Sequence, residues 1–405
     1  MVGGKGSTGR SNFAQRFGLD SAERKAACAE VVKQIESAGL DTIRLSFADQ
    51  HGILRGKSLV ASEAAPAMTN GCSMTSSLLL KDTSHKTVFP VWQKGAGLGL
   101  SALQGASDFI MLPDPATFRI LPWAANTGWM LCDIYFADGA PVPFSTRKLL
   151  QDACKELADR GRQLVIGLEV EFHVFHIEDA KRANGDAGSM GLPGAAPEVS
   201  LLTRGFQYLT EVLSDEVEPV ADMLRQVCED LHLPVRSMEV EFGPSQLEFT
   251  FAPVDAMEAA DNMILFRSAV KQACRRKGLL ATFMCRPKVE GVFSSGWHMH
   301  QSLVDTNTGA NLFTPQDNDE VLSQTGRYFT GGLLAHAAAS TLFACPTVNA
   351  YKRFQPFALA PDRICWARDN KGAMIRAIAG AGDPASRIEQ RIGEPGANPY
   401  LYIMS

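Results

Sequence analysis

The chain has 405 residues, of which 45% are hydrophobic and 20% are charged, and its formal net charge is −5. The length and composition are typical of a globular protein with a substantial core and about two or three domains. The small negative charge argues against nucleic acid as a partner. The sequence contains no run of about 18 or more apolar residues, so it predicts no membrane-spanning helix. Residues 1–5 lack the apolar core of a signal peptide, and the nine cysteines form no CxxC pair. We therefore expect a cytoplasmic protein with reduced thiols.

The beginning of the chain predicts an arm and then a capped helix. Residues 1–18 are rich in glycine, serine and charged side chains, so we expect a flexible arm there. Asp20-Ser21-Ala22-Glu23 resembles a capping box, which opens a helix that ends near Gly39. The first folded domain is expected to begin with this helix.

A set of strands follows in the same domain. Alternating apolar and polar residues at 42–49 and 53–57 predict a hairpin. Further strands are expected at 111–115 and 130–135. We assign residues 19–138 to this N-terminal domain.

Residues 139–405 are assigned to a second, larger domain of mixed α and β content. Helices are predicted at 146–160, 216–231 and 259–277 from apolar residues at a spacing of about 3.6. The glycine-, alanine- and proline-rich span 184–199 predicts a long surface loop. Strands and helices alternate without a regular βαβ pattern, which favours an α+β fold.

Five short stretches of the second domain carry carboxylates, histidines or arginines at alternate positions. In a strand, side chains two residues apart share a face, so each stretch gathers its polar groups on one face. Glutamates at this spacing lie about 7 Å apart and repel one another unless cations bind between them. The pattern therefore predicts a site for several divalent metal ions. The stretches are 169–173, 239–241, 248–250, 298–300 and 387–391. The apolar residues predicted on the opposite face are Val170, Phe172, Val240, Phe249, Met299, Ile388 and Ile392.

Six motifs resemble those of the glutamine synthetase family, in the family's order and with features of its glutamate–amine ligase branch. They are EVEF at 169, EFGPSQLE at 241, SSGWHMHQSL at 294, PTVNAYKRF at 346, ARDNKGAMIR at 367 and RIEQRIGEPGANPYL at 387. The resemblance implies a β-grasp N-terminal domain, a catalytic domain with an antiparallel strand funnel, and ring-shaped homo-oligomers with active sites between subunits. The chain ends at Ser405, where relatives continue, so we expect the family's C-terminal helices to be absent.

The resemblance also implies ATP as a co-substrate and divalent metal ions, about two or three per active site. By position, one metal site would take Glu171, Glu241 and Glu248, and a second would take Glu169, His298 and Glu389. Ligands that are mostly oxygen, with one imidazole, suit Mg²⁺ or Mn²⁺ better than Zn²⁺. Taken one at a time, these glutamates could instead be the solvated face of amphipathic strands.

Substrate contacts are implied by the remaining matches. Arg353 resembles the family's clamp on the α-carboxylate of glutamate, and Arg391 resembles the arginine that holds the acid being activated. Lys371 stands where the family has an arginine near the transferred phosphoryl group. Ser294 and Gly296 match the segment that contacts glutamate. The residues that resemble nucleotide contacts are His300, Ser302, Arg376 and Arg387. Instead of binding substrate, Arg353 and Arg391 could each form an ion pair with a neighbouring acidic side chain.

The chain departs from the family at two acids that capture ammonium. Leu359 stands in place of the flap glutamate, and Asn70 in place of an aspartate that comes from the neighbouring subunit. Without these carboxylates an apolar hole replaces the ammonium pocket. We therefore expect an ATP-dependent ligase that converts the γ-carboxylate of glutamate to an acyl phosphate. An organic amine, alkyl or aryl, would then attack it to give a γ-glutamylamide.

Three alternatives stay open. The chain could be a true glutamine synthetase that uses ammonia, or an inactive family member that serves as a scaffold. The acid could also be an analogue of glutamate, because Phe293-Ser294 stands where the family often has Asn-Gly beside that substrate.

Overall fold

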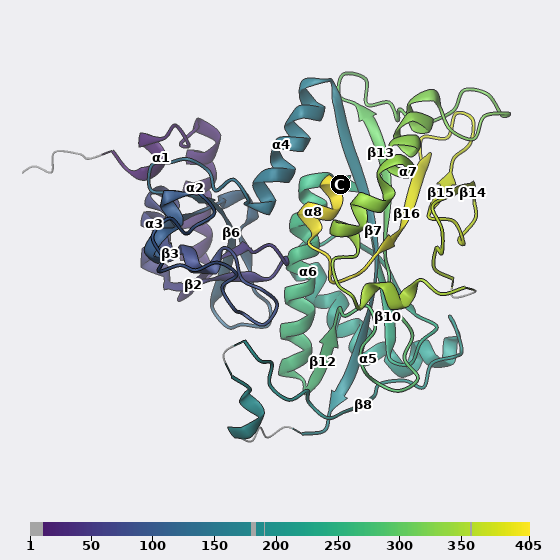
Figure 1. Ribbon diagram of the computed structural model, residues 1–405, viewed down its shortest axis with the longest axis horizontal. Coiled ribbons are helices and arrows are strands. Elements are labelled where there is room, and N and C mark those ends of the chain that lie inside the picture. Colours follow the sequence, from purple (N-terminus) through teal and green to yellow (C-terminus); the bar gives the residue numbers. More distant parts are fainter. Residues whose placement is uncertain (1–10, 180–183, 190, 357–358) are drawn as a thin grey trace, which may run out of the picture. The chain divides into compact units, whose positions relative to one another are not determined.

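The computed structural model describes residues 11–179, 184–189, 191–356 and 359–405. The chain divides into two compact units, one of Met1–Asp49 with Leu54–Ser145 and the other of Gln50–Ile53 with Thr146–Ser405 (Figure 1). Each unit combines helices with strands, in agreement with the mixed α and β content predicted from the sequence.

The first unit is built on a sheet with the strand order β2-β1-β6-β4-β3, and β5 pairs with β6. β1 and β2 form the predicted antiparallel hairpin. On β1 the side chains of Ile43, Leu45 and Phe47 are buried, because alternate residues of a strand face the core. The strands are β1 (Thr42–Ala48), β2 (Leu54–Val60), β3 (Cys72–Thr75), β4 (Asp108–Pro113), β5 (Arg119–Ile120) and β6 (Thr127–Tyr135). The helices are α1 (Phe13–Arg16), α2 (Ala22–Ser37) and α3 (Ala64–Asn70), with 3₁₀ turns at Ala61–Glu63, Ser76–Leu78, Ser101–Ala106 and Pro115–Thr117.

The structure corrects two expectations at the start of the chain. The predicted arm contains the short helix α1, in which Phe13 is buried and packs edge to face on Phe17 and Tyr135. Residues 1–10 of that arm lie outside the described residues. The helix α2 is capped by Ser21, whose hydroxyl accepts a hydrogen bond from the Arg24 N–H. Asp20 is not the cap, because its carboxylate pairs with Lys25 at 2.9 Å.

A sheet with the strand order β14-β15-β16-β13-β7-β10-β9 forms the second unit, and the long strand β7 runs through its middle (Figure 1). Three further strands, β8, β11 and β12, also pair with β7. The strands are β7 (Arg162–Ile177), β8 (Val199–Leu201), β9 (Val235–Val240), β10 (Gln246–Phe251), β11 (Val254–Asp255), β12 (Leu279–Thr282), β13 (Trp297–Asp305), β14 (Trp366–Arg368), β15 (Ile375–Ile378) and β16 (Arg387–Gly393).

The helix α6 packs on the apolar face of this sheet. The Phe266 ring of α6 lies 5.8 Å from the Phe172 ring and 5.6 Å from the Phe249 ring, centroid to centroid. The helices of the unit are α4 (Thr146–Asp159), α5 (Glu211–Asp230), α6 (Ala256–Arg276), α7 (Gln324–Ala344) and α8 (Pro399–Met404), with 3₁₀ turns at Asn184–Ala187 and Ala350–Arg353. In the described part of the chain, no helix combines the length and the apolarity needed to span a membrane.

The structure differs from the sequence prediction at two element boundaries. The helix α5 begins five residues before the predicted start at 216, because Thr210 ends the preceding extended segment there. The predicted loop 184–199 contains a 3₁₀ turn at Asn184–Ala187, and its last residue begins β8. Residue 190 of this loop lies outside the described residues.

The predicted two-sided strands are confirmed. All five polar stretches lie on or directly beside five consecutive strands of the sheet, β16-β13-β7-β10-β9. The seven apolar residues predicted for the opposite face are all buried, with none more than 5% exposed. One face of the sheet is therefore core, and the other carries the polar groups.

Replacing Gly331 by alanine is expected to stabilise the protein. This glycine lies inside α7, and an added Cβ would meet no heavy atom within 4 Å. Alanine in a helix interior should raise the free energy of unfolding by about 0.5–1 kcal/mol, measured by thermal or denaturant unfolding. In the matched control Gly326→Ala, the Cβ would lie 3.2 Å from the Leu322 Cβ, so little or no gain is expected. A lower unfolding temperature for Gly331→Ala would contradict this prediction.

Candidate active site

The strand register brings the polar side chains of the sheet face to face. Glu169 of β7 lies opposite His298 of β13, and Glu171 lies opposite Glu248 of β10. Side chains directly opposite each other on antiparallel strands have Cβ atoms about 5 Å apart. The polar groups therefore converge across strands as well as along them.

Glu171, Glu241 and Glu248 form the first cluster, in which one oxygen from each lies within 4.8 Å of the other two. Burial and then the charge of Glu171 raise the pKa of the Glu248 carboxyl. Burial and then the charge of Glu241 likewise raise the pKa of Glu171. Three carboxylates that disfavour one another's ionisation fit a divalent cation, whose charge removes this repulsion.

Glu169, His298 and Glu389 were predicted as the second ligand set, and the structure brings them together in pairs. The His298 Nδ1 lies 3.2 Å from the Glu169 Oε2 and 3.7 Å from the Glu389 Oε1. Burial and then the charge of Arg391 lower the pKa of His298 to about 4. The neutral imidazole is the form of histidine that binds a metal ion, so the lowered pKa suits ligation.

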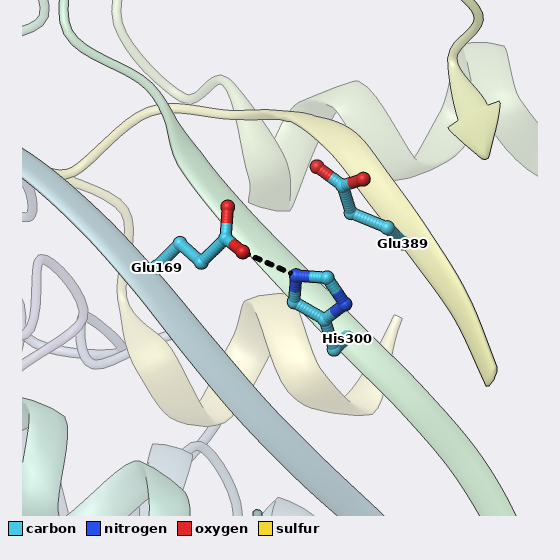
Figure 2. Close-up of side chains that lie close together, drawn as sticks. All are labelled: Glu169, His300 and Glu389. Carbon is cyan, nitrogen blue, oxygen red and sulfur yellow. Dashed lines mark hydrogen bonds and ion pairs between the residues drawn. The ribbon is translucent and has the colours of Figure 1, made fainter. Parts of the chain in front are cut away.

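Two other groups of three place their donor atoms within 4.8 Å of one another. One combines Glu169 with His300 and Glu389, which reach toward one another from β7, β13 and β16 (Figure 2). The other combines Glu169 with Glu248 and His298. The nucleotide contact predicted for His300 stays a prediction; in the structure the His300 Nε2 lies 2.7 Å from the Glu169 Oε1. Its spacing of two residues from His298 was the signal in the sequence for this position.

Glu389 is fully buried and is surrounded by cations. The Arg376 Nη1 donates to its Oε2 at 3.1 Å, and the Arg391 Nη1 donates to its Oε1. Burial opposes ionisation, but His298 and Arg391 outweigh it and lower the pKa of Glu389. Glu389 is therefore held as a carboxylate.

Arg353 lies buried against the backbone of Gly296. Its Nη1 donates to the Arg391 carbonyl oxygen at 2.8 Å, and its Nη2 lies 3.1 Å from the His298 Nε2. A Cβ at Gly296 would come within 2.4 Å of the Arg353 Nη2, so only glycine leaves room for the guanidinium. Glu394 accepts hydrogen bonds from the Thr347 N–H and hydroxyl, and the same hydroxyl accepts from the Ala350 N–H at the start of the 3₁₀ turn that carries Arg353.

Two predicted glutamate contacts carry buried polar atoms without a hydrogen-bond partner among the described residues. These atoms are the Arg391 Nε and the Ser294 Oγ. An unsatisfied buried donor costs about 1–3 kcal/mol, which a ligand that supplies the partner would recover. The site therefore holds unused hydrogen-bonding capacity where the sequence predicts an acid substrate.

Comparison with known proteins decides the family. Residues 143–405, more than half of the chain, match the family model "Glutamine synthetase, catalytic domain". The chain belongs to the glutamine synthetase family. The resemblance found in the six motifs is confirmed, and the protein is an ATP-dependent carbon–nitrogen ligase. Enzymes of the glutamine synthetase family generally use ATP and divalent metal ions.

The proteins similar to this ligase have names that refer to different amine substrates. A γ-glutamylanilide synthase from Acinetobacter sp. is 44% identical over 398 residues, which are 97% of this chain and 79% of that protein. A glutamate–isopropylamine ligase from Pseudomonas sp. is 30% identical over 388 residues, or 95% of this chain and 80% of that protein. Proteins named glutamine synthetase match at 27–32% identity. The solved structure "GmaS/ADP complex-Conformation 1" superimposes with a TM-score of 0.73 at 27% identity, covering 92% of this chain and 78% of that chain.

One residue of this glutamine synthetase-type site was missed by the sequence interpretation. The Gln246 Nε2 donates to the Glu171 Oε2 and to the Ser295 Oγ, both at 3.0 Å, and its Oε1 accepts from the Gly243 N–H. This buried amide orients the Glu171 carboxylate. Gln246 is uncharged and so does not belong to the pattern of alternating charges, although it shares a strand face with Glu248.

Three further residues were predicted as substrate contacts: Ser302, Arg387 and Lys371. Ser302 follows His300 by two residues on β13, so both share a face of the strand. The Arg387 Nε donates to the His300 Nδ1 at 3.0 Å. Lys371 is exposed in a turn, and its charge reaches Glu241. Ser302, Arg387 and Lys371 stay predictions as substrate contacts.

Leu359 and Asn70, the two residues predicted for the amine pocket, belong to different units of the chain. Leu359 is 76% exposed and has a positive φ of 53°, which an L-residue with a branched side chain rarely adopts. The two residues before it lie outside the described residues. Asn70 ends α3 in the first unit and donates a hydrogen bond to the Thr69 hydroxyl. An amine pocket at Leu359 and Asn70 remains a prediction.

Proposed function

We propose that the enzyme activates the γ-carboxylate of glutamate with ATP and condenses it with an organic amine, giving a γ-glutamylamide, ADP and phosphate. The observation that carries this proposal is the position of Arg353 and Arg391, buried beside the clustered glutamates. The arginines suit the carboxylates of an amino acid, and the glutamates suit the cations that accompany a triphosphate. A site with both can bring an acid to ATP.

In this proposal divalent ions, Mg²⁺ or Mn²⁺, offset the repulsion between the substrate carboxylate and the triphosphate. Glu171, Glu241 and Glu248 would hold one ion, and Glu169, His298 and Glu389 would hold the other, with His300 beside them. Arg353 holds the α-carboxylate of glutamate. Arg391, whose Nε is free of protein partners among the described residues, donates to the acid being activated.

The reaction balances as two displacements. A γ-carboxylate oxygen of glutamate attacks the γ-phosphorus of ATP, and ADP leaves with the electrons of the broken phosphorus–oxygen bond. The amine nitrogen then attacks the carbonyl carbon of the acyl phosphate. The carbon–nitrogen bond forms, phosphate leaves with the electrons of the carbon–oxygen bond, and the nitrogen loses a proton to solvent water.

An organic amine is favoured over ammonia as the second substrate because the residues predicted to surround the amine carry no negative charge. Leu359 and Asn70 cannot supply the negative charge that attracts an ammonium ion and accepts its proton. An aryl amine is neutral near pH 7 and needs no such acid. The names of the γ-glutamylanilide synthase and the glutamate–isopropylamine ligase, which match 97% and 95% of this chain, support the same class of substrate.

A comparison of amines tests this function. We expect kcat/KM for an alkyl or aryl amine to exceed that for ammonia by at least about tenfold, because each buried methylene contributes about 0.8 kcal/mol and two of them together give about a tenfold preference. Release of phosphate from ATP and the mass of the product would be measured with glutamate and each amine in turn. A preference for ammonia would indicate a glutamine synthetase. Absence of amine-dependent phosphate release would indicate an inactive scaffold.

The assembly is proposed on the same basis. We propose a β-grasp fold for the N-terminal unit, a strand funnel for the catalytic unit, and ring-shaped homo-oligomers with active sites between subunits. The family match and the described sheets support these features. A cytoplasmic location is the expectation from the composition. Analytical ultracentrifugation would measure the number of subunits.

A further inference from the structure

Three phenylalanine rings lie together on the surface of the catalytic unit. Phe206, Phe242 and Phe293 are 50%, 38% and 40% exposed. Their ring centroids are 5.0–5.7 Å apart, and each pair is edge to face. Apolar side chains gathered on a protein surface are a feature of ligand-binding and protein-binding sites. We call these three residues the phenylalanine patch.

The phenylalanine patch borders the first glutamate cluster. The Phe242 N–H donates to the Glu241 Oε2 at 2.9 Å. Phe293 packs on Gly243, where an added Cβ would lie 3.0 Å from the Phe293 Cβ, and it directly precedes Ser294. Burial and then the charge of Glu241 raise the pKa of Tyr208, two residues after Phe206, to about 12. The patch is therefore beside the carboxylates and not on a remote face.

The backbone holds Phe206 in place in an unusual conformation. Its φ is +63°, a left-handed value that bulky side chains rarely adopt. The Phe206 N–H donates to the Phe242 carbonyl oxygen at 2.8 Å. Gly205 approaches so closely that an added Cβ would lie 2.4 Å from the Pro244 nitrogen. Strained conformations of this kind concentrate at functional sites, where the surrounding structure maintains them.

We propose that the phenylalanine patch binds the aromatic ring of an aryl amine, the second substrate of the reaction proposed above. This inference rests on that reaction and narrows its amine to the aryl class. Edge-to-face rings offer both faces and edges to a further ring, a geometry that a saturated chain cannot match. The aromatic ring then lies on the patch, with its amino group directed toward the carboxylate being activated.

The test compares aniline with methylamine, which has no ring, in steady-state kinetics with ATP and glutamate. In the double variant Phe206→Leu/Phe293→Leu, leucine keeps an apolar side chain but removes the rings. We expect the ratio of kcat/KM for aniline to that for methylamine to fall by about tenfold or more, because each aromatic pair contributes about a twofold to tenfold preference. The single variants should each lower this ratio by a smaller factor. In Phe206→Leu alone, KM for glutamate should remain within about twofold.

The matched control is Tyr328→Leu, which removes another exposed ring, 72% exposed on α7. It should leave the aniline-to-methylamine ratio unchanged. An unchanged ratio in a folded double variant would overturn the inference, as would a rise in KM for glutamate without a change in amine preference. If the double variant does not fold, the two single variants decide by the same criterion.

Binding distinguishes failure of the inference from failure of the proposed function. Saturation-transfer NMR would follow aniline on the full chain in the presence of ADP and glutamate. A signal in the original protein that is lost in the Phe→Leu variants supports the patch, even if no amine supports turnover. Absence of that signal, or its persistence in the variants, overturns the patch as the aryl site. Absence of turnover with every amine overturns only the proposed reaction.

Discussion

Glu241→Gln is expected to reduce amine-dependent ATP cleavage by at least about a hundredfold, whereas Glu239→Gln should change it by less than about threefold. Glu239 lies near the end of β9, and Glu241 directly follows the strand, two residues further along the chain. Only Glu241 places an oxygen within 4.8 Å of both Glu171 and Glu248. In the described residues, Glu239 belongs to no such group of three, and it accepts a hydrogen bond from the Ser237 hydroxyl.

The contrast between these neighbours separates metal binding from general surface charge. Each variant removes one negative charge from the same region, so a nonspecific effect of charge would affect both equally. Loss of a ligand should also weaken the binding of Mn²⁺, measured by calorimetry, because each carboxylate contributes directly to the cation's coordination. Equal rates and equal Mn²⁺ affinity in the two variants would contradict the metal site at Glu171, Glu241 and Glu248.

Gly296→Ala is expected to raise KM for glutamate by about a hundredfold. A charge-assisted hydrogen bond contributes about 1.5–3 kcal/mol, and Arg353 is proposed to make such bonds with the α-carboxylate. The alanine Cβ would stand 2.4 Å from the Arg353 Nη2, so the guanidinium would have to move. The charge itself stays in the protein. The variant therefore tests the position of Arg353, and Arg353→Lys tests its forked geometry with a comparable expected loss.

Two controls accompany these variants. Gly331→Ala changes a glycine in the same unit without a contact within 4 Å, and Arg363→Lys changes an arginine that pairs with Asp362 at the surface. Both should leave KM for glutamate within about twofold. Thermal unfolding would verify that Gly296→Ala is folded at the assay temperature. A folded Gly296→Ala protein with an unchanged KM for glutamate would contradict the role of Arg353 as the carboxylate clamp.

The sequence by itself determined which strand faces carry the chemistry. Side chains alternate by the geometry of a single strand, so the pattern Glu169, Glu171 against Val170, Phe172 can be recognised without knowledge of its neighbours. The six ordered motifs likewise identified the family, because they are local strings of residues. The same local reasoning placed the helices α4 and α6 within a few residues.

Only the tertiary structure decided which groups meet. The strand order and register place His300 beside Glu169 and bring Gln246 under Glu171, over separations of 131 and 75 residues. They also assemble the phenylalanine patch from three separate segments of the chain. Register between distant strands depends on the packing of the whole sheet, and the alternation within one strand contains no information about its partner.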